Sequence, residues 1–256
     1  MKPHIVAFGG GVDSTAMILG LYENERPIDL ILFADTGGER PETYTHIENF
    51  SKWLVNKGLP EITVVKRVRR DGSLETLEQE CHRRKNLPSI AYGFKSCSQK
   101  HKIAPQDKFL NSWQPAKDWW KTGQKCVKYI GYDAGESRRA DNAAKRDDPK
   151  YDYQYPLIEW GWEREDCLET IKRHNIENVG KSACFFCPSS RKSEIIELYE
   201  KHPDLLKRAI DIEEQAELTS IKGLGRNYAW KTIIELHEAQ LPLPFTGFDL
   251  PCDCTE

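Results

Sequence analysis

Two cysteines lie close together in the last third of the chain, in the stretch KSACFFCPSSRKSE. Cys184 and Cys187 form a CxxC pair, a spacing at which two thiolates can bind a metal ion or cluster or act as a redox dithiol. Zinc sites usually have two such pairs, and a thioredoxin-like dithiol follows a strand early in its domain; the sequence has neither pattern. The pair predicts a metal or sulfur centre, with plain thiols as the alternative.

A glycine-rich stretch, GGGVDS at 9–14, follows a short apolar run near the start of the chain. A loop between a strand and a helix leaves backbone N–H groups that can bind an anion, and glycine lets the backbone approach phosphate oxygens closely. The stretch does not satisfy GxGxxG cleanly, and no lysine follows the glycines as in GxxxxGK[ST]. It therefore predicts a phosphate-binding loop that belongs to neither of these two types.

The elements that must position these residues alternate along the chain. Strand, helix, strand, helix, strand at this spacing favours right-handed crossovers and a parallel sheet. The expected strands are 4–8, 29–34, 62–66, 127–131 and 155–158, and the expected helices are 12–23, 42–56 and 163–174. Residues 71–124 are expected to be irregular, helical segments to cover 195–206 and 208–218, and the Pro-rich tail to be extended.

The predicted fold class is α/β: a Rossmann-like parallel sheet with flanking helices, plus a small C-terminal helical segment that contains cysteines. We expect an adenine-nucleotide-binding domain over 1–180 and a CxxC-containing helical segment with its tail over 181–256. The oligomeric state stays open, and a homo-oligomer is one possibility.

The composition restricts the class of protein. The formal charge is −3, so any contact with nucleic acid must come from a local basic patch. The sequence contains neither a long apolar run nor the apolar core of a signal peptide. We therefore expect a cytoplasmic protein without membrane contact, in which the eight cysteines serve metal or sulfur chemistry rather than disulfides.

Four segments in chain order resemble one superfamily. The loop at 9–14 resembles the pyrophosphate loop SGGxDS of the N-type ATP pyrophosphatases, also called adenine nucleotide α-hydrolase-like proteins. DTGGERPETY at 35–44 resembles the DTGxExPET segment of the phosphoadenylyl sulfate (PAPS) reductase branch, and GYDAGESRRA at 131–140 resembles its GxRxxES-RA element. YPLIEW at 155–160 with Asp166 resembles PLxxW…D. Within this branch, the chain is similar to the DNA-phosphorothioation sulfurtransferase/ATP pyrophosphatase type.

The resemblance implies a site for ATP with Mg²⁺. Asp13, Ser14 and Arg138 are implied as catalytic. Arg191 and Lys192 follow the CxxC and are placed to contact a substrate phosphate. Gly9 stands where the family has serine, and Tyr132 or Asp133 stands where it has a basic residue. The residues implied in nucleotide binding are Gly9, Gly10, Gly11, Val12, Asp13, Ser14, Asp35, Thr36, Gly37, Glu39, Glu136, Ser137 and Arg138, with Arg191 beside them.

The resemblance also implies a third cysteine ligand. Cys97, in SCSQKHKIAP, matches the Cys…Lys…Pro segment with which related enzymes bind a [4Fe–4S] cluster. Cys97, Cys184 and Cys187 are then the cluster ligands, and Lys100 is expected near the negative charge of the cluster. Zinc with help from His101, or plain thiols, are the alternatives. The fourth ligand is open, with Cys81, Cys126, Cys252 and Cys254 as candidates, and Cys167 is expected in the core.

Three functions follow as expectations. The first is ATP-dependent sulfur transfer: ATP is cleaved to AMP and pyrophosphate to activate a DNA or tRNA acceptor, with sulfur on a cluster or a Cys persulfide. A donor such as a cysteine desulfurase is then needed, and Cys254 could relay sulfur. The second is a PAPS or adenylyl sulfate reductase, although the Glu-Cys-Gly-Leu/Ile-His ending of such enzymes is missing. The third is a nucleotide-binding subunit without turnover.

Two basic runs, 66–70 and 82–85, flank a turn that contains glycine. Trp113, Trp119 and Trp120 follow them. Basic side chains with exposed aromatic rings are what a phosphate backbone and unstacked bases need, so nucleic-acid contact is one interpretation. Solvated charges and core tryptophans are the other.

Overall fold

The computed structural model describes residues 1–144 and 148–240, which form two compact units. The first unit comprises Met1–Ala34, Arg40–Val65 and Gln106–Ser182. The second unit comprises Asp35–Glu39, Lys66–Pro105 and the described part of Ala183–Glu256. The second unit thus brings together segments that are far apart in the sequence, and each unit has its own core. The division into 1–180 and 181–256 stays a prediction.

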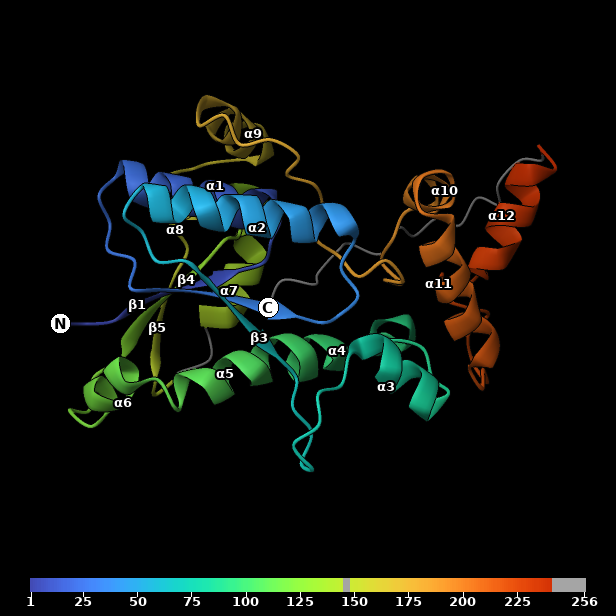
Figure 1. Ribbon diagram of the computed structural model, residues 1–256, viewed down its shortest axis with the longest axis horizontal. Helices are drawn as coiled ribbons and strands as arrows, with labels where there is room; N and C mark the ends of the chain where they lie inside the picture. The colour runs from blue at the N-terminus through green and yellow to red at the C-terminus, as the bar shows by residue number, and fades with distance from the viewer. Residues whose placement is uncertain (145–147, 241–256) are drawn as a thin grey trace. The chain divides into compact units, whose positions relative to one another are not determined.

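A five-stranded sheet runs through the first unit and confirms the predicted Rossmann-like α/β class (Figure 1). Its strands are β1 (His4–Phe8), β2 (Leu30–Asp35), β3 (Ile62–Lys66), β4 (Cys126–Ile130) and β5 (Tyr151–Gln154). The order is β3-β2-β1-β4-β5, and β1 pairs in parallel with both β2 and β4. The strand order reverses between β1 and β4, which is where open α/β sheets bind ligands.

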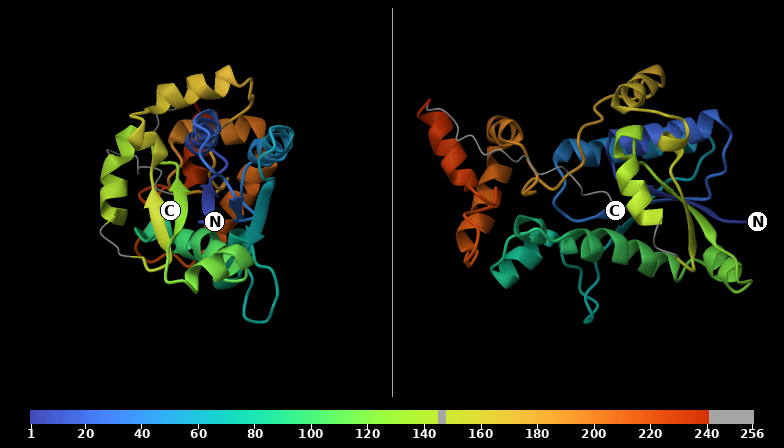
Figure 2. Two further views of the ribbon diagram at one scale, coloured as in Figure 1. Left: turned by 90° about the vertical axis from the view of Figure 1, so that its left-hand side faces the viewer. Right: turned by 180° about the vertical axis from the view of Figure 1, so that it is seen from behind.

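Helices cover both faces of the sheet, because the side chains of β1 alternate between two cores. Val6 and Phe8 pack in one core, whereas Ile5 packs in another with Leu110 and Ala116. Figures 1 and 2 show α1, α2 and α9 on one face and α5 and α6 on the other. The helices are α1 (Val12–Glu23), α2 (Pro41–Asn56), α5 (Ala104–Leu110), α6 (Gln114–Trp120), α7 (Ser137–Ala144), α8 (Pro156–Glu159) and α9 (Arg164–Arg173).

A buried polar contact joins α1 to α2. The hydroxyl of Thr15 donates to the carbonyl of Gly11 at 2.8 Å, and its oxygen therefore accepts from Nε2 of His46 at 3.0 Å. The His46 ring is almost fully buried and stacks on Phe50, with ring centroids 5.5 Å apart. Burial disfavours the imidazolium cation and lowers the pKa of His46 to about 4.

The second unit is built from helices around its own core, in which Phe185, Phe186 and Trp230 are fully buried. A buried carboxylate organises the end of this unit: Glu213 accepts hydrogen bonds from the backbone N–H groups of Leu224 at 2.7 Å and Trp230 at 2.9 Å. Its elements are α3 (Leu77–Arg84), η1 (Ser89–Tyr92), α4 (Ser96–Ser98), η2 (Gln99–Ile103), α10 (Lys192–Lys201), α11 (Pro203–Gln215) and α12 (Trp230–Glu238).

The structure corrects three expectations about the elements. Residues 71–124 are mostly helical, and Thr76 with Gln79 forms a capping box that starts α3. The strand expected at 155–158 is wrong: Pro156 begins the short helix α8, because proline has no N–H for a sheet ladder but fits the first turn of a helix. Pro203 separates α10 from α11, where one helix was expected over 195–206.

Two further expectations have mixed outcomes. Cys167 is fully buried in the core of the first unit, as predicted. The extended tail, with Cys252 and Cys254, lies outside the described residues. Helix α12 was not expected at all. In the part of the chain that the structure describes, no helix is both long and apolar enough to cross a membrane.

The lowered pKa of His46 predicts a pH dependence of stability. Between pH 6.5 and about 4 the unfolded chain binds a proton that the folded chain excludes, so the free energy of unfolding should fall as the pH falls through this window. The loss approaches about 3 kcal/mol at its acid end. His46→Gln keeps a donor for Thr15 and should flatten this part of the curve in urea unfolding, whereas His237→Gln on α12 should not. Equal pH profiles for wild type and His46→Gln would contradict the assignment.

The buried carboxylate of Glu213 predicts a local loss of stability. Glu213→Gln replaces one oxygen by an NH₂ group that faces backbone donors, and should cost about 2 kcal/mol. Faster hydrogen exchange at the amides of α12 would report it. The matched control is Glu214→Gln, which removes only the surface ion pair with Lys231 and should cost less than about 1 kcal/mol.

Candidate functional site

The glycine loop begins where β1 ends and is closed by its own serine. The Ser14 hydroxyl accepts from the N–H of Gly9 at 3.1 Å and donates to the carbonyl of Gly11 at 3.2 Å. Gly10 has φ +79°, which a side chain rarely adopts. The Ser182 hydroxyl donates to the carbonyl of Gly9, so a second segment of the first unit supports the loop. A rigid turn of backbone N–H groups thus leads into α1.

The loop after β4 touches the start of α1. A Cβ atom added at Gly131 would lie 2.9 Å from the Cα of Ser14, so a side chain at position 131 would collide with backbone. The carboxylates of Asp133 and Glu136 follow. Burial raises the pKa of Glu136, and the charges of Asp133 and Asp13 add to that rise; the charge of Asp133 also adds to the burial-driven rise in the pKa of Asp13. Oδ1 of Asp133 is buried without a hydrogen-bond partner among the described residues. The two loops at the switch point therefore combine anion-binding backbone with carboxylates.

Arg164 is a residue of this site that the sequence did not reveal. Its Nη1 lies 2.7 Å from Oδ1 of Asp13. Burial raises the pKa of Asp13, and the Arg164 guanidinium opposes that rise. Arg164 thus supplies a cation to a site that has no basic residue at 132 or 133. It is far from the loop in sequence, and nothing in the spacing indicates the contact.

The two arginines of GYDAGESRRA differ in their surroundings. Arg139 forms an ion pair with Glu136, and its guanidinium lies 4.4 Å from the centre of the Tyr132 ring. Arg138 and Ser137 are exposed. The structure therefore orders Arg139 as part of the scaffold and leaves Arg138 accessible.

The segment Asp35–Glu39, at the end of β2, belongs to the second unit and folds onto itself. Oδ1 of Asp35 accepts from the N–H of Gly37 at 2.7 Å, and its Oδ2 lies 3.1 Å from Nζ of Lys66. Gly37 has φ +74°, and a Cβ there would lie 2.3 Å from Cγ2 of Thr76. The conformation of this loop, here called the DTGGE loop, requires glycine at position 37.

The DTGGE loop holds the CxxC turn directly. Phe185 donates its N–H to the carbonyl of Gly38 at 2.7 Å, and Glu39 forms an antiparallel bridge with Cys184. Oγ1 of Thr36 lies 3.1 Å from Sγ of Cys184. The CxxC pair itself is a tight turn, in which Cys187 donates its N–H to the carbonyl of Cys184 at 2.9 Å. A motif implied in nucleotide binding and a motif implied in sulfur chemistry therefore form one packed element.

Cys97, Cys184 and Cys187 line one small cavity, here called the cysteine cavity, together with Thr36 and Lys102. Its volume is about 30 Å³, roughly the space of one water molecule in the liquid. Within the described ranges, no group of three or more His, Cys, Asp or Glu side chains is arranged to hold a metal ion. The three thiols are the donor type that an iron–sulfur cluster takes, and the cluster stays a prediction.

The other cysteines divide clearly as candidates for a fourth ligand. Cys81 lines a neighbouring cavity together with Cys97. Burial raises the pKa of the Cys81 thiol to about 12, and the charges of Glu80 and Cys97 add to the rise. Cys126 is fully buried in the core of the first unit. Cys252 and Cys254 lie outside the described residues. Across 1–144 and 148–240, no disulfide joins the cysteines.

Three successive residues after Cys97 face different surroundings. Helix α4 continues through the wide π-helical turn η2 into α5. Lys100 lines the cavity that contains Cys81, His101 contacts Glu80, and Lys102 lines the cysteine cavity. Lys102 therefore lines the cavity of all three cysteines, and Lys100 shares a cavity with Cys97.

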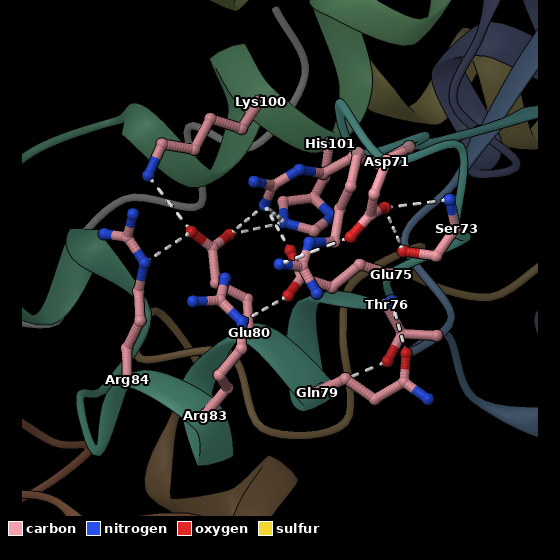
Figure 3. Close-up of polar contacts among 12 residues, drawn as sticks. Asp71, Ser73, Glu75, Thr76, Gln79, Glu80, Arg83, Arg84, Lys100 and His101 are labelled. Carbon is pink, nitrogen blue, oxygen red and sulfur yellow. Dashed lines mark hydrogen bonds and ion pairs between the residues drawn. The ribbon is translucent and has the colours of Figure 1, made fainter.

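The two basic runs meet at two buried carboxylates (Figure 3). Arg67 contacts both Glu75 and Glu80, Arg83 contacts Glu75, and Arg84 contacts Glu80. His101 Nε2 lies 2.7 Å from Glu80. Burial alone would raise the pKa of Glu80, but hydrogen bonds from His101 and Lys100 and the charge of Arg67 hold it well below its usual range. His101 thus belongs to this ionic network.

Two remaining expectations concern Arg191 and the three tryptophans. Arg191 is exposed at the start of α10, where its N–H is bonded to Glu194 at 2.9 Å. Trp119 and Trp120 pack against the core of the first unit, and their ring N–H groups bond to backbone carbonyls at 3.1 and 2.9 Å. Trp113 packs there too. The three tryptophans are therefore partly buried against this core.

Comparisons with known proteins identify the family. Residues 3–180 match the family model of the phosphoadenosine phosphosulfate reductase domain. No curated protein matches the sequence. A solved structure, the U34-tRNA thiolase NcsA from Methanococcus maripaludis with its [4Fe-4S] cluster, matches 96% of this chain and 84% of that chain at 14% identity, with a TM-score of 0.43. The family match covers well over half of the residues, and the chain belongs to the phosphoadenosine phosphosulfate reductase domain family.

Proposed function

We propose that the protein is an ATP-dependent sulfur-transfer enzyme that cleaves ATP to AMP and pyrophosphate and so activates a DNA or tRNA acceptor. One observation carries the proposal: Thr36 of the DTGGE loop lines the same cavity as Cys97, Cys184 and Cys187, with its hydroxyl oxygen 3.1 Å from Sγ of Cys184. A family motif for nucleotides and a set of three thiols are thus built as one element. This pairing favours chemistry that uses a nucleotide and sulfur together.

The first unit supplies the groups for nucleotide activation. The N–H groups of the Gly9–Ser14 loop and the start of α1 bind phosphate oxygens, and the positive end of the helix stabilises charge that develops on them. Arg164 and the accessible Arg138 add positive charge. Asp13, Asp133 and Glu136 offer carboxylate oxygens, which suit Mg²⁺ that is bound together with substrate phosphates. Bound Mg²⁺ would neutralise charge on the departing pyrophosphate.

The second unit supplies the groups for sulfur transfer. Three thiols at one cavity provide a carrier for a persulfide and a second thiolate that can attack its inner sulfur; the S–S bond of the persulfide breaks, a disulfide forms between the two cysteines, and hydrosulfide is released to the activated acceptor. A thiol reductant then restores the two cysteines. Lys102 lines the same cavity and supplies a cation near the three thiols. The sulfur is proposed to be carried on these thiols as a persulfide or on a cluster that they bind. A cysteine desulfurase is the class of protein that would load them, and Cys254 is a further relay candidate.

The family match itself favours a second candidate function, the reduction of a phosphosulfate nucleotide to sulfite. The same glycine loop would hold the nucleotide, and no ATP would be cleaved. The two functions separate in one assay of the anaerobically purified protein. Pyrophosphate released from ATP supports the first function, and sulfite formed from PAPS with thioredoxin, without ATP cleavage, overturns it.

The first prediction for this function concerns Asp13. Asp13→Ala removes the carboxylate from the first turn of α1, and the rate of pyrophosphate release from ATP should fall about 100-fold or more. Asp118→Ala on α6 is the control, because Asp118 pairs only with its neighbours on the surface. Turnover that survives Asp13→Ala in a folded protein would remove the loop from the mechanism.

The second prediction concerns the three cysteines. Replacing any one of the three cysteines by alanine should abolish the transfer of radiolabelled sulfur to tRNA or DNA, while pyrophosphate release from ATP continues. The variants are Cys97→Ala, Cys184→Ala and Cys187→Ala. Cys167→Ala, which removes a buried thiol from the first unit, is the control. Iron and sulfide analysis of the wild type then separates a cluster from a persulfide. Full sulfur transfer by the Cys184→Ala protein would sink the assignment.

A further inference from the structure

A second cavity lies beside Cys97, within the second unit. Its volume is about 330 Å³, which falls within the size range of ligand pockets, roughly 300–1,000 Å³. We call it the Tyr92 cavity, and Cys81, Arg84, Tyr92, Phe94, Cys97 and Lys100 are among its lining residues. Cys97 lines both this cavity and the cysteine cavity. A ligand bound here would lie next to one of the three thiols.

The wall of the Tyr92 cavity carries fixed positive charge. Oε1 of Glu80 accepts a hydrogen bond from Nζ of Lys100 at 3.1 Å and lies 3.2 Å from Nε of Arg84. The same carboxylate contacts Arg67 and His101 through its other oxygen, so its charge is shared among several donors (Figure 3). Glu80 therefore holds Lys100 and Arg84 in place at the cavity. The cations around Glu80 outnumber its single negative charge, so the wall stays positive. An anionic group suits this wall.

Two aromatic rings complete the cavity. Phe94 is 67% exposed, so its ring is accessible to a ligand. The turn before it is fixed, because Gly93 has φ +87° and Nε of Arg226 donates to the carbonyl of Ala91 at 3.2 Å. The hydroxyl oxygen of Tyr92 is buried and has no hydrogen-bond partner in the described part of the chain. The rings thus offer a stacking face and a polar atom that a ligand can satisfy.

The segment that forms this wall is the basic part of an otherwise acidic protein. Residues 66–105 contain ten Lys and Arg but four Asp and Glu, a net charge of +6, whereas the whole chain has −3. In the second unit this segment includes α3, η1, α4 and the narrow hairpin between β3 and α3, which is visible in Figures 1 and 2. A polyanion would be attracted to this segment in preference to the rest of the chain.

We propose that the Tyr92 cavity binds one nucleotide of a single-stranded nucleic acid, with the base against Phe94 and Tyr92 and the phosphate at Arg84 and Lys100, beside Cys97. A stacked base in a duplex cannot enter a cavity of this size, so an unpaired nucleotide is required. The inference rests on the proposed function, since it identifies the place where the acceptor of that reaction binds. It adds the requirement that the acceptor be locally unpaired.

The test measures binding without ATP, so that it does not depend on catalysis. Fluorescein-labelled single-stranded RNA and DNA 12-mers of mixed sequence are titrated with the full chain, and anisotropy gives the Kd. Phe94→Ala should raise the Kd of a single strand about fivefold or more, because stacking on that ring is lost. Ser96→Trp, which places a large ring in the same cavity, should do the same. Phe94 is exposed, so its removal should leave the fold intact.

Matched variants distinguish the cavity from a general basic surface. Leu168→Ala removes another exposed apolar side chain, from α9, and should leave the Kd unchanged. Arg69→Ala removes a charge from the hairpin and should weaken single strands and duplexes alike. A bound single strand should also slow the alkylation of Cys97 by iodoacetamide, as read by mass spectrometry of the peptide.

Three results would overturn the proposal. These are an unchanged Kd for Phe94→Ala, duplex DNA that binds as tightly as single strands, or a mononucleotide that competes as well as the 12-mer per molecule. None of them depends on ATP turnover. If single strands bind in the cavity but pyrophosphate is never released from ATP, the proposed function fails and the binding site stands.

Discussion

The carboxylate of Glu80 is the charge on which the second unit depends. A buried carboxylate is costly unless cations and hydrogen bonds surround it, and here four side chains from three segments do so. The contact to Arg67 anchors the end of the hairpin after β3, Arg84 belongs to α3 itself, and the contacts to Lys100 and His101 anchor η2. The positions of Cys81 and Cys97 follow, since each lies next to or near one of these anchored residues. The basic side chains that give this site its positive charge are thus also the partners that stabilise the buried Glu80 carboxylate.

The DTGGE loop is the second organising element. Its glycines are required for shape: a Cβ at Gly38 would lie 2.7 Å from the ring of Phe186, and Gly37 makes room for Thr76. The loop therefore serves as a template for both the CxxC turn and the start of α3. A family motif that reads as a nucleotide signature in the sequence is, in this chain, equally the support of the cysteines. Substitutions at Gly37 or Gly38 would therefore disturb the start of α3 and the CxxC turn together.

Local patterns predicted the first unit well and the second poorly. Apolar strands and the Gly-rich turn are encoded by neighbouring residues, so β1, α1 and β3 could be read from the sequence. The fifth strand was predicted at 155–158 because that stretch is largely apolar, but Pro156 begins a helix there and the strand is β5. The approach of Cys97 to the CxxC pair was predicted from the family resemblance alone. The contact of Arg164 with Asp13 could not be predicted. Both contacts link segments that are distant in sequence. The buried network of Glu75 and Glu80 was likewise hidden, because its basic members read as solvated charges.

The wide turn η2 fixes the length of the segment between Cys97 and α5. A π-helical turn holds one residue more than the α-helical turn it replaces. Deleting one residue from 99–103 would remove this extra residue and let the segment relax into a regular α-helix, with the residues before and after the turn kept in helical register. Lys100, His101 and Lys102 could then no longer face three different surroundings, because the shorter turn has one residue fewer between Cys97 and α5. Insertions and deletions, which surface loops commonly tolerate, would therefore disturb this segment of the chain.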